Sequence, residues 1–390
     1  MEEATRPLPR CAHRTWHGRC WSLGIAQSRA DPPRRPRAGR PRVRGQRMMP
    51  TRRILLALSA AGLARPALAQ RRPMAAATQL GWLRNGEFAP IMVAEAKGFF
   101  EAEGIAHRIM DGGPGRNPIP LVAAGQAQFG LATSGMHLIA AKVARDPVDV
   151  TAVGALYQES PSAYLRLASP GDPEPTPKDL AGRTIGVQAG SEYFVRAMCR
   201  RNGVDEGRVK IVTVQANAEP LLIGRVDFFS GWVTNQAYQI EQEVAKPDAP
   251  ANIRGKTWQA VRLSRWGLPS YGDVIFTATK TAQESPELVQ GYLKAVARAV
   301  RFILDSPQEA IGIVARFPGQ VENAERLAWR FRVQNPLHNS PATQAHGALW
   351  MEPSVWADMS TVLREANEIP RDVPPEAIMT TRFLPGASPA

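Results

Sequence analysis

Apolar and polar residues follow two different periods along most of the chain. Short apolar runs alternate with segments in which apolar residues recur every three or four positions. The runs predict strands and the periodic segments predict helices, so the alternation is typical of an α/β fold with mostly parallel sheets. In the first part of the pattern we expect strands over 78–83, 106–110, 129–132, 150–156 and 162–167, and helices over 89–103, 118–124 and 136–145.

A proline-rich segment divides this pattern into two lobes. Residues 169–177 include four prolines, which is typical of a surface connection. After it we expect helices over 191–202, 219–225 and 236–244, and strands over 184–187, 209–214, 228–231, 259–262 and 274–279, the last two ending the second lobe. Helical segments then follow over 285–303, 308–317, 322–334 and 354–366. We therefore predict one βα lobe from residues 70–176 and 275–390, a second βα lobe from residues 177–274, and a ligand cleft between them.

Two N-terminal segments lie outside this pattern. Residues 48–69 combine a basic start, an apolar run and an Ala-x-Ala end, and this order favours a secretory signal peptide over a buried core helix. The run is too short to span a bilayer, and residues 51–56 resemble a twin-arginine signal. Residues 1–47 are rich in Arg, Pro and Gly, and we interpret them as a disordered, mis-assigned extension upstream of a start at Met48 or Met49.

The formal net charge of +13 comes almost entirely from these two segments. Residues 1–47 contain 12 arginines and three acidic residues, whereas from residue 70 onward 33 basic side chains are balanced by 32 acidic ones. A nucleic-acid binder needs a surplus of Lys and Arg on its folded part, so this class of partner is excluded.

Cleavage after Ala69 would leave Cys199 as the one cysteine, which rules out an internal disulfide. We predict a periplasmic monomer.

Common catalytic and metal-binding motifs are absent after residue 69. The sequence contains no phosphate loop, no Gly-x-Ser-x-Gly elbow and no His-Glu-x-x-His pair. The remaining histidines, His107, His137, His338 and His346, do not pair with acidic residues at the spacing of metal ligands. A hydrolase or metalloenzyme is therefore disfavoured, and we expect no catalytic residue, no metal and no cofactor.

Aromatic and small polar residues gather instead at the expected strand ends and helix starts. Each alone is equally compatible with a partly buried Trp or an ordinary helix cap. Jointly, aromatic faces and amide edges are typical of a site for a flat nitrogen heterocycle. In this site Trp82 and Trp232 would stack on the ligand, Asn85 and Asn235 would bond its ring edge, Gly190 and Ser191 at a helix start would contact a carbonyl or anion, and Tyr271 and Asp273 would bond a further edge.

Three segments resemble the family of proteins that bind or synthesise the thiamine pyrimidine precursor. They are residues 81–104, which run from Trp82 to the sequence VAEAKGFFEAEG; residues 177–192, which contain PKDLAGRTIGV and GSE; and residues 220–235, which run from PLLIGRVD to Trp232 and Asn235. The resemblance extends in the same order from about residue 78 to residue 310. It implies the type II periplasmic-binding-protein fold, and it implies that an exported member is the solute-binding subunit of an ABC importer, which delivers its ligand to a membrane permease.

The chain also departs from the pyrimidine-synthesising members of that family. Those enzymes use a histidine after the first Trp and a cysteine-rich motif, whereas this sequence has Phe88 at the matching position and Cys199 alone. These differences disfavour a synthase that consumes its own histidine. An acidic residue that many relatives carry before the first Trp is Gly81 here. Related branches bind riboflavin, sulfonates or nitrate, and the two Trp residues favour an aromatic ligand over an inorganic ion.

We predict a solute-binding protein without enzymatic activity, for a thiamine-precursor pyrimidine or a similar flat heterocycle. A pyrimidine-biosynthesis enzyme, a binder of riboflavin or a sulfonate, and a sensor domain are the alternatives. The predicted ligand-binding residues are Trp82, Asn85, Phe88, Ser134, Gly190, Ser191, Trp232, Asn235, Tyr271 and Asp273.

Overall fold

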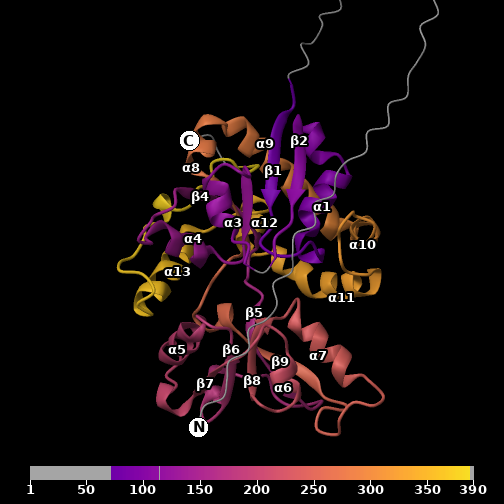
Figure 1. Ribbon diagram of the computed structural model, residues 1–390, viewed down its shortest axis with the longest axis vertical. Helices are drawn as coiled ribbons and strands as arrows, with labels where there is room; N and C mark the ends of the chain where they lie inside the picture. The colour runs from indigo at the N-terminus through magenta and orange to yellow at the C-terminus, as the bar shows by residue number, and fades with distance from the viewer. Residues whose placement is uncertain (1–71, 114, 387–390) are drawn as a thin grey trace, which may run out of the picture. The chain divides into compact units, whose positions relative to one another are not determined.

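The computed structural model describes residues 72–113 and 115–386, all within the compact unit Ala69–Ala390. Its strands form two five-stranded sheets, each accompanied by helices (Figure 1). The predictions for residues 1–47 and 48–69 fall outside the described residues. Two sheets with flanking helices confirm the predicted α/β class, but the expectation of mostly parallel sheets is wrong, because each sheet combines parallel and antiparallel pairs.

The first sheet has the strand order β2-β1-β3-β10-β4. Strand β1 pairs in parallel with β2 and β3, and β10 pairs antiparallel with β3 and β4. The sheet is therefore mixed. Its strands are β1 (Met74–Gln79), β2 (Ile105–Met110), β3 (Phe129–Ala132), β4 (Val150–Tyr157) and β10 (Gly272–Ala278).

Helices from both ends of the described chain cover the first sheet. They are α1 (Ala89–Ala96), α2 (Phe99–Ala102), α3 (Pro118–Ala123), α4 (Gly135–Lys142), α8 (Thr279–Glu284), α9 (Pro286–Asp305), α10 (Pro307–Ala315), α11 (Ala324–Gln334), α12 (Pro341–His346) and α13 (Pro353–Glu365). The predicted helix over 89–103 is two helices, because Gly98 has a left-handed φ of 66° and ends α1. Tyr292 of α9 stacks on Phe129 of β3 at 3.7 Å, which fixes α9 against the sheet.

The second sheet has the strand order β7-β6-β8-β5-β9. Its strands are β5 (Ser162–Ala168), β6 (Thr184–Val187), β7 (Lys210–Thr213), β8 (Phe228–Trp232) and β9 (Thr257–Arg262), and its helices are α5 (Glu192–Arg201), α6 (Glu219–Leu222) and α7 (Gln236–Val244). The assignment of strand 162–167 to the first lobe is wrong, because β5 pairs antiparallel with β8 and β9. The chain thus enters the second sheet before the proline-rich segment.

The chain passes between the sheets twice, after β4 and before β10. The expectation that strand 274–279 ends the second lobe is also wrong, because β10 pairs with β3 and β4 of the first sheet. One 3₁₀ turn, η4 (Leu263–Trp266), lies on the second passage, between β9 and β10, whereas η1 (Gly86–Phe88) lies between β1 and α1. The remaining turns are η2 (Pro177–Leu180), η3 (Glu206–Arg208), η5 (Asn335–His338) and η6 (Pro375–Ala377).

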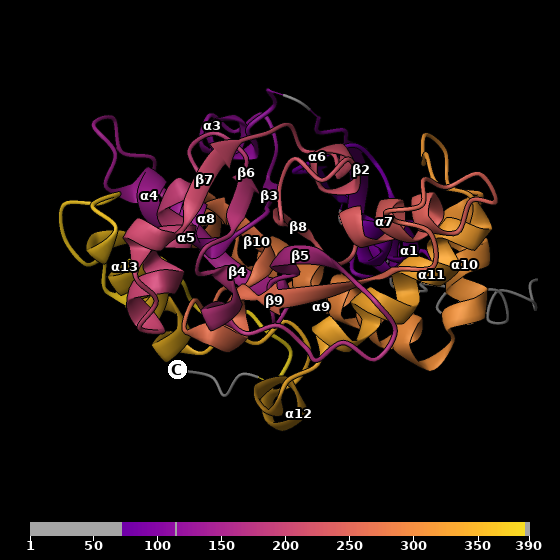
Figure 2. The ribbon, with the colours of Figure 1, turned by 90° about the horizontal axis from the view of Figure 1, so that it is seen from below.

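Helices of the two lobes also touch on either side of the strands (Figure 2). On one side, Trp329 of α11 is buried in the apolar cluster of the second lobe and donates to Glu241 of α7 at 2.7 Å. On the other, Arg201 of α5 forms an ion pair with Glu365 of α13 at 3.1 Å. The lobes are therefore held in a closed arrangement. Within the described ranges, every helix is too short or too polar to cross a bilayer.

Candidate functional site

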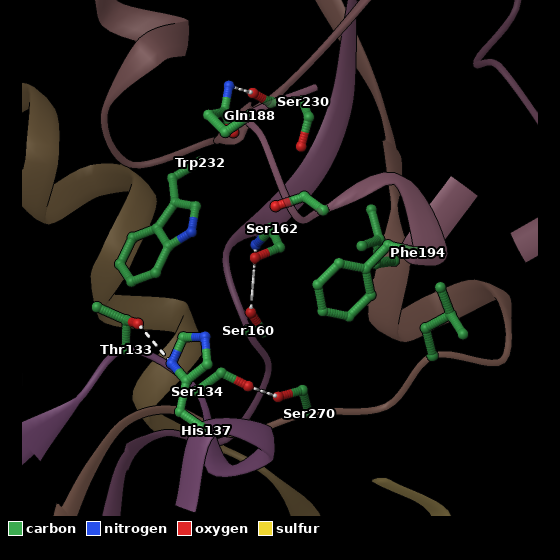
Figure 3. A pocket seen from close by; sticks show the side chains of 14 residues that line it. Thr133, Ser134, His137, Ser160, Ser162, Gln188, Phe194, Ser230, Trp232 and Ser270 are labelled. Carbon is green, nitrogen blue, oxygen red and sulfur yellow. Dashed lines mark hydrogen bonds between the residues drawn. The ribbon is translucent and has the colours of Figure 1, made fainter. Parts of the chain in front are cut away.

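A pocket of about 160 Å³ lies between the two sheets (Figure 3). Residues of both lobes and of both passages line it, and all of them except Gln188, Leu263 and Leu268 are small, carry a hydroxyl group or carry an aromatic ring. They are Thr133, Ser134, His137, Ser160, Ser162, Gln188, Ser191, Phe194, Ser230, Gly231, Trp232, Leu263, Leu268 and Ser270. A ligand held here would touch both lobes at once.

The β3–α4 turn forms the first-lobe wall of the pocket. Ser134 caps α4 by accepting from the backbone N–H of Met136 at 3.2 Å, as serine commonly does at a helix start. Its hydroxyl also bonds the hydroxyl of Ser270 at 2.8 Å. This bond ties the helix start to the passage that leads into β10, so the wall and the passage are positioned together.

His137 projects into the pocket from the first turn of α4. Its Nδ1 bonds the hydroxyl of Thr133 at 3.2 Å. Burial lowers the pKa of His137 below its ordinary value, so the ring is neutral at pH 7. A neutral imidazole can donate to or accept from a ligand without adding charge.

The second-lobe wall is built at the ends of β6 and β8. Gln188 donates to the backbone carbonyl of Ser230 at 3.1 Å, and the backbone N–H of Trp232 donates to Gln236 at 2.8 Å. These bonds fix the two strand ends while Trp232 stays half-buried in the lining. Ser191 precedes α5 and makes no capping bond with its side chain, which leaves its hydroxyl available to a ligand.

Three of the predicted site residues line this pocket: Ser134, Ser191 and Trp232. Gly190 lines a neighbouring hollow beside α5 and α13, and Asn235 lines a groove between α7 and α11, where its side-chain oxygen accepts from Arg326 at 2.9 Å. Trp82 is 39% exposed and stands outside the lining. The expected strand over 78–83 places Trp82 wrongly, because β1 ends at Gln79 and the following residues form bends.

The other four predicted residues are buried away from the pocket. Asn85 caps η1 by accepting from Glu87 at 2.9 Å, and Phe88 is fully buried in the core of the first lobe. The Tyr271 hydroxyl accepts from the backbone of Glu352 at 2.6 Å, and Asp273 is completely buried at the start of β10. Ser270, the residue before Tyr271, lines the pocket, but these four side chains are buried in the protein.

Sequence reasoning missed most of the hydroxyl groups and His137. Ser160, Ser162 and Ser270 sit on the passages between sheets, and the position of a passage depends on which strands pair. His137 was weighed only as a metal ligand. Among the described residues no cluster of three His, Cys, Asp or Glu side chains could hold a metal ion. The buried Cys199 lies outside the pocket lining, and burial raises the pKa of its thiol to about 11.

Comparison with known proteins identifies the family. The family model described as NMT1/THI5 like matches residues 85–310, which is more than half of the chain. The chain belongs to the NMT1/THI5-like family. This confirms the resemblance seen in the three sequence segments.

The similar proteins include synthases and binding proteins. The chain is 24% identical to a 4-amino-5-hydroxymethyl-2-methylpyrimidine phosphate synthase of Legionella pneumophila over 62% of this chain and 73% of the relative. It is 25% identical to the riboflavin-binding protein RibY of Chloroflexus aurantiacus over 79% of this chain and 86% of the relative. The periplasmic aliphatic sulphonate-binding protein SsuA of Escherichia coli superposes with a TM-score of 0.58 at 16% identity, covering 81% and 95% of the two chains. The fold is that of periplasmic binding proteins, as predicted.

Proposed function

We propose that this NMT1/THI5-like protein is the solute-binding subunit of an ABC importer and that it binds a thiamine-precursor pyrimidine or a similar flat nitrogen heterocycle. The lining of the pocket between the sheets carries this proposal. Trp232 and Phe194 supply ring faces, while Gln188, His137 and several serines supply hydrogen-bonding groups. A flat heterocycle fits this combination because its faces are apolar and its edge is polar.

The charge of the lining favours this ligand over a sulfonate. No Asp, Glu, Lys or Arg of the described chain lines the pocket, and His137 is neutral at pH 7 because burial lowers its pKa. A buried anion is costly without a cation beside it. An uncharged ring avoids that cost.

The volume of the pocket favours a single ring. The pocket measures about 160 Å³, and a protein cavity of about 150 Å³ holds one benzene-sized molecule. A pyrimidine with small substituents matches this space. The fused rings of riboflavin, the ligand named for RibY, would need a larger space between the lobes.

We further propose that the ligand is bound without chemical change. A reactive cysteine should be exposed and have a lowered pKa, but Cys199 is buried outside the lining and its pKa is raised to about 11. No described acidic side chain lines the pocket to act with His137 as an acid–base pair. The synthases among the relatives make an enzyme the alternative that an experiment must exclude.

The fold and the signal-like segment over 48–69 support the proposed role in transport. An exported protein with this fold would capture its ligand in the periplasm and pass it to a permease. A pocket lined by both lobes suits such a carrier, because closure of the lobes around a ligand would separate it from water until the lobes open.

Calorimetric titration of the purified protein tests the ligand directly. The probes are 4-amino-5-hydroxymethyl-2-methylpyrimidine, riboflavin and a short alkanesulfonate. We expect saturable one-to-one binding of the pyrimidine and no heat from the other two. Tighter binding of riboflavin or the sulfonate would overturn the ligand assignment.

Mass spectrometry of the same samples tests the absence of chemistry. We expect the pyrimidine to be recovered unchanged and the protein to keep its mass. A new small-molecule product, or loss of mass at His137, would establish an enzyme and overturn the binding-protein proposal.

A further inference from the structure

Two buried carboxyl groups, those of Glu87 and Asp273, interact in the first lobe, and the cation that acts on both, Arg330, is shared with Glu322. Asp273 is 0% exposed, and neither of its carboxylate oxygens has a hydrogen-bond donor among the described residues. Glu87 of η1 is 5% exposed, and its carboxyl group lies near enough to that of Asp273 for each group to shift the pKa of the other. A hydrogen bond between two carboxyl groups requires a proton on one of them.

The charged groups around the pair do not replace that proton. Arg330 of α11 is the cation that acts on the pair; its Nε and Nη2 donate to Glu322, and its Nη1 has no acceptor among the described residues. Glu322 also accepts from Arg326 and from the backbone N–H of Gly86. Tyr157 of β4 is the remaining titratable neighbour, and its hydroxyl donates to Gln334 at 3.1 Å.

Burial therefore favours the protonated form of the pair. Desolvation raises the pKa of Glu87 to about 7, and desolvation together with Glu87 raises the pKa of Asp273 well above its ordinary value. Two carboxylates in contact in a dry interior cannot both ionise at little cost. The pair titrates as a unit rather than as two separate residues.

The pair lies where the parts that join the lobes converge. Asp273 is the second residue of β10, and Ser270, three residues earlier, lines the pocket and bonds Ser134. Glu87 lies in η1, which is bonded through Gly86 to Glu322 and Gln334. Glu322 in turn holds two arginines of α11, the helix that reaches into the second lobe.

The backbone at Asp273 is strained in the closed arrangement. Its φ of 46° lies in the left-handed region, which is uncommon for any residue other than glycine, although asparagine and aspartate adopt it more often than most. Strain of this kind persists only where the surrounding contacts maintain it. The shared carboxyl contact is one such constraint, and it is placed at the passage that must bend when the lobes separate.

We propose that Glu87 and Asp273 share one proton when the lobes are closed, and that loss of this proton favours the open arrangement. The pair takes its proton from solvent when the lobes close and returns it to solvent when they open, so the proton exchange needs no other reactant. Closure takes up a proton, and closure therefore weakens as pH rises. For one proton the open-to-closed ratio changes by up to about tenfold per pH unit. The coupling does not depend on which ligand the pocket takes.

Two substitutions separate the shared proton from the fold. Asp273→Asn supplies an amide that can donate to Glu87 at any pH, and asparagine tolerates the left-handed backbone at this position. Glu87→Gln places the amide on the other partner, where it can donate to Asp273 at any pH. This variant replaces Asp273→Asn in the test if Asp273→Asn does not fold. Asp372→Asn is the matched control, because it removes one carboxylate from the exposed ion pair with Arg364.

Distance measurements between the lobes in the ligand-free protein test the coupling. Spin labels at the exposed positions Lys280 and Ile223 report on the first and second lobes, in the full chain with its three cysteines replaced by alanine. The range from about pH 6 to about pH 8 brackets the pKa of Glu87. Over this range we expect the fraction of molecules with open lobes to rise severalfold in the parent protein and in Asp372→Asn. Asp273→Asn and Glu87→Gln should stay closed throughout.

Infrared spectroscopy supplies the second measurement. A buried protonated carboxyl group should absorb at about pH 6 in the parent protein and not in Asp273→Asn. Absence of this band in the parent, equal distances at both pH values, or a pH response in both pair variants equal to that of the parent would overturn the proposal. Because no ligand is present, these outcomes leave the proposed ligand unaffected.

Discussion

Trp232 is the residue whose role in ligand binding is simplest to test. Its backbone is fixed by Gln236, and its ring lies half-buried in the pocket lining rather than in the core. A ring in this position should contribute more to binding than to folding. A core Trp would do the opposite, since its truncation costs about 3–5 kcal/mol of stability.

We expect Trp232→Ala to weaken pyrimidine binding by about tenfold or more, because a stacked pair is worth about 1 kcal/mol beyond the apolar area that it buries. Its loss of stability should be smaller than that of a core Trp. Titration calorimetry and thermal melting of the same variant separate the two effects. Trp258→Ala is the control, since Trp258 is a half-buried residue of the same sheet outside the lining. Unchanged affinity in a folded Trp232→Ala variant would remove this residue from the site.

The raised pKa of Glu87 makes the free energy of unfolding depend on pH. Its pKa is raised in the folded protein from 4.5 to about 7, so between these values the folded state binds a proton that the unfolded state does not. Stability therefore falls as pH rises through this window, by up to about 1.4 kcal/mol per pH unit for one proton. Glu87→Gln should remove this part of the slope in urea unfolding from about pH 5 to about pH 7. Parallel slopes for the two proteins would show that Glu87 ionises freely when folded.

The site could be predicted only in part from single residues. Ser134, Ser191 and Trp232 are predicted correctly because strand ends and helix starts can be recognised from the sequence pattern. In open α/β sheets these positions face a cleft. Tyr271 and Asp273 are neighbours of the lining residue Ser270, yet their side chains are buried elsewhere. Which side chains of the segments between the sheets face the pocket depends on how the strands pair. The local pattern of apolar and polar residues does not contain that information.

Most helices and strands could be predicted from the sequence. The lobe to which each strand belongs was harder to predict. The final helices α10, α11 and α13 lie close to their predicted ranges, because their apolar stripes are regular. Strand β5 was placed in the wrong lobe because the proline-rich segment looked like the boundary. Its partners β8 and β9 lie more than 60 residues later in the chain, so the pairing is not a local signal.

Helix α11 joins the lobes through a carboxylate that receives two indole N–H groups. Glu241 accepts from Trp329 of the first lobe and from Trp258 of the second, each at 2.7 Å. Arg326 of α11 also stacks on Tyr238, with its guanidinium carbon 3.9 Å from the ring centroid. The two indoles provide a matched pair of substitutions, because only one of their bonds crosses between lobes.

We expect Trp329→Phe and Trp258→Phe to lower stability by similar amounts, about 1.5–3 kcal/mol for a hydrogen bond to a charged group. Only Trp329→Phe should also increase the open population, since its bond spans the two lobes. Urea unfolding measures the first effect and the distance between labels on Lys280 and Ile223 measures the second. Equal opening in both variants would mean that the bond from α11 does not hold the lobes together.

For the whole molecule, the fold and the position of the pocket imply that ligand and closure are linked. Residues of both lobes line the pocket, and contacts on both sides hold the lobes together. A ligand enclosed from both sides can enter only when these contacts open, and it then favours the closed state by its contacts with both walls.

We therefore expect a saturating pyrimidine to shift the population toward the closed arrangement, and the shift should be largest at about pH 8, where ionisation of the Glu87 and Asp273 pair favours opening. Small-angle scattering of the full chain should show a smaller radius of gyration with ligand than without it. Trp232→Ala, at the same ligand concentration, should show a smaller shift because it loses contact area in one wall. If calorimetry shows saturation while the scattering curves with and without ligand coincide at this pH, binding does not close the lobes and the ligand enters by another route.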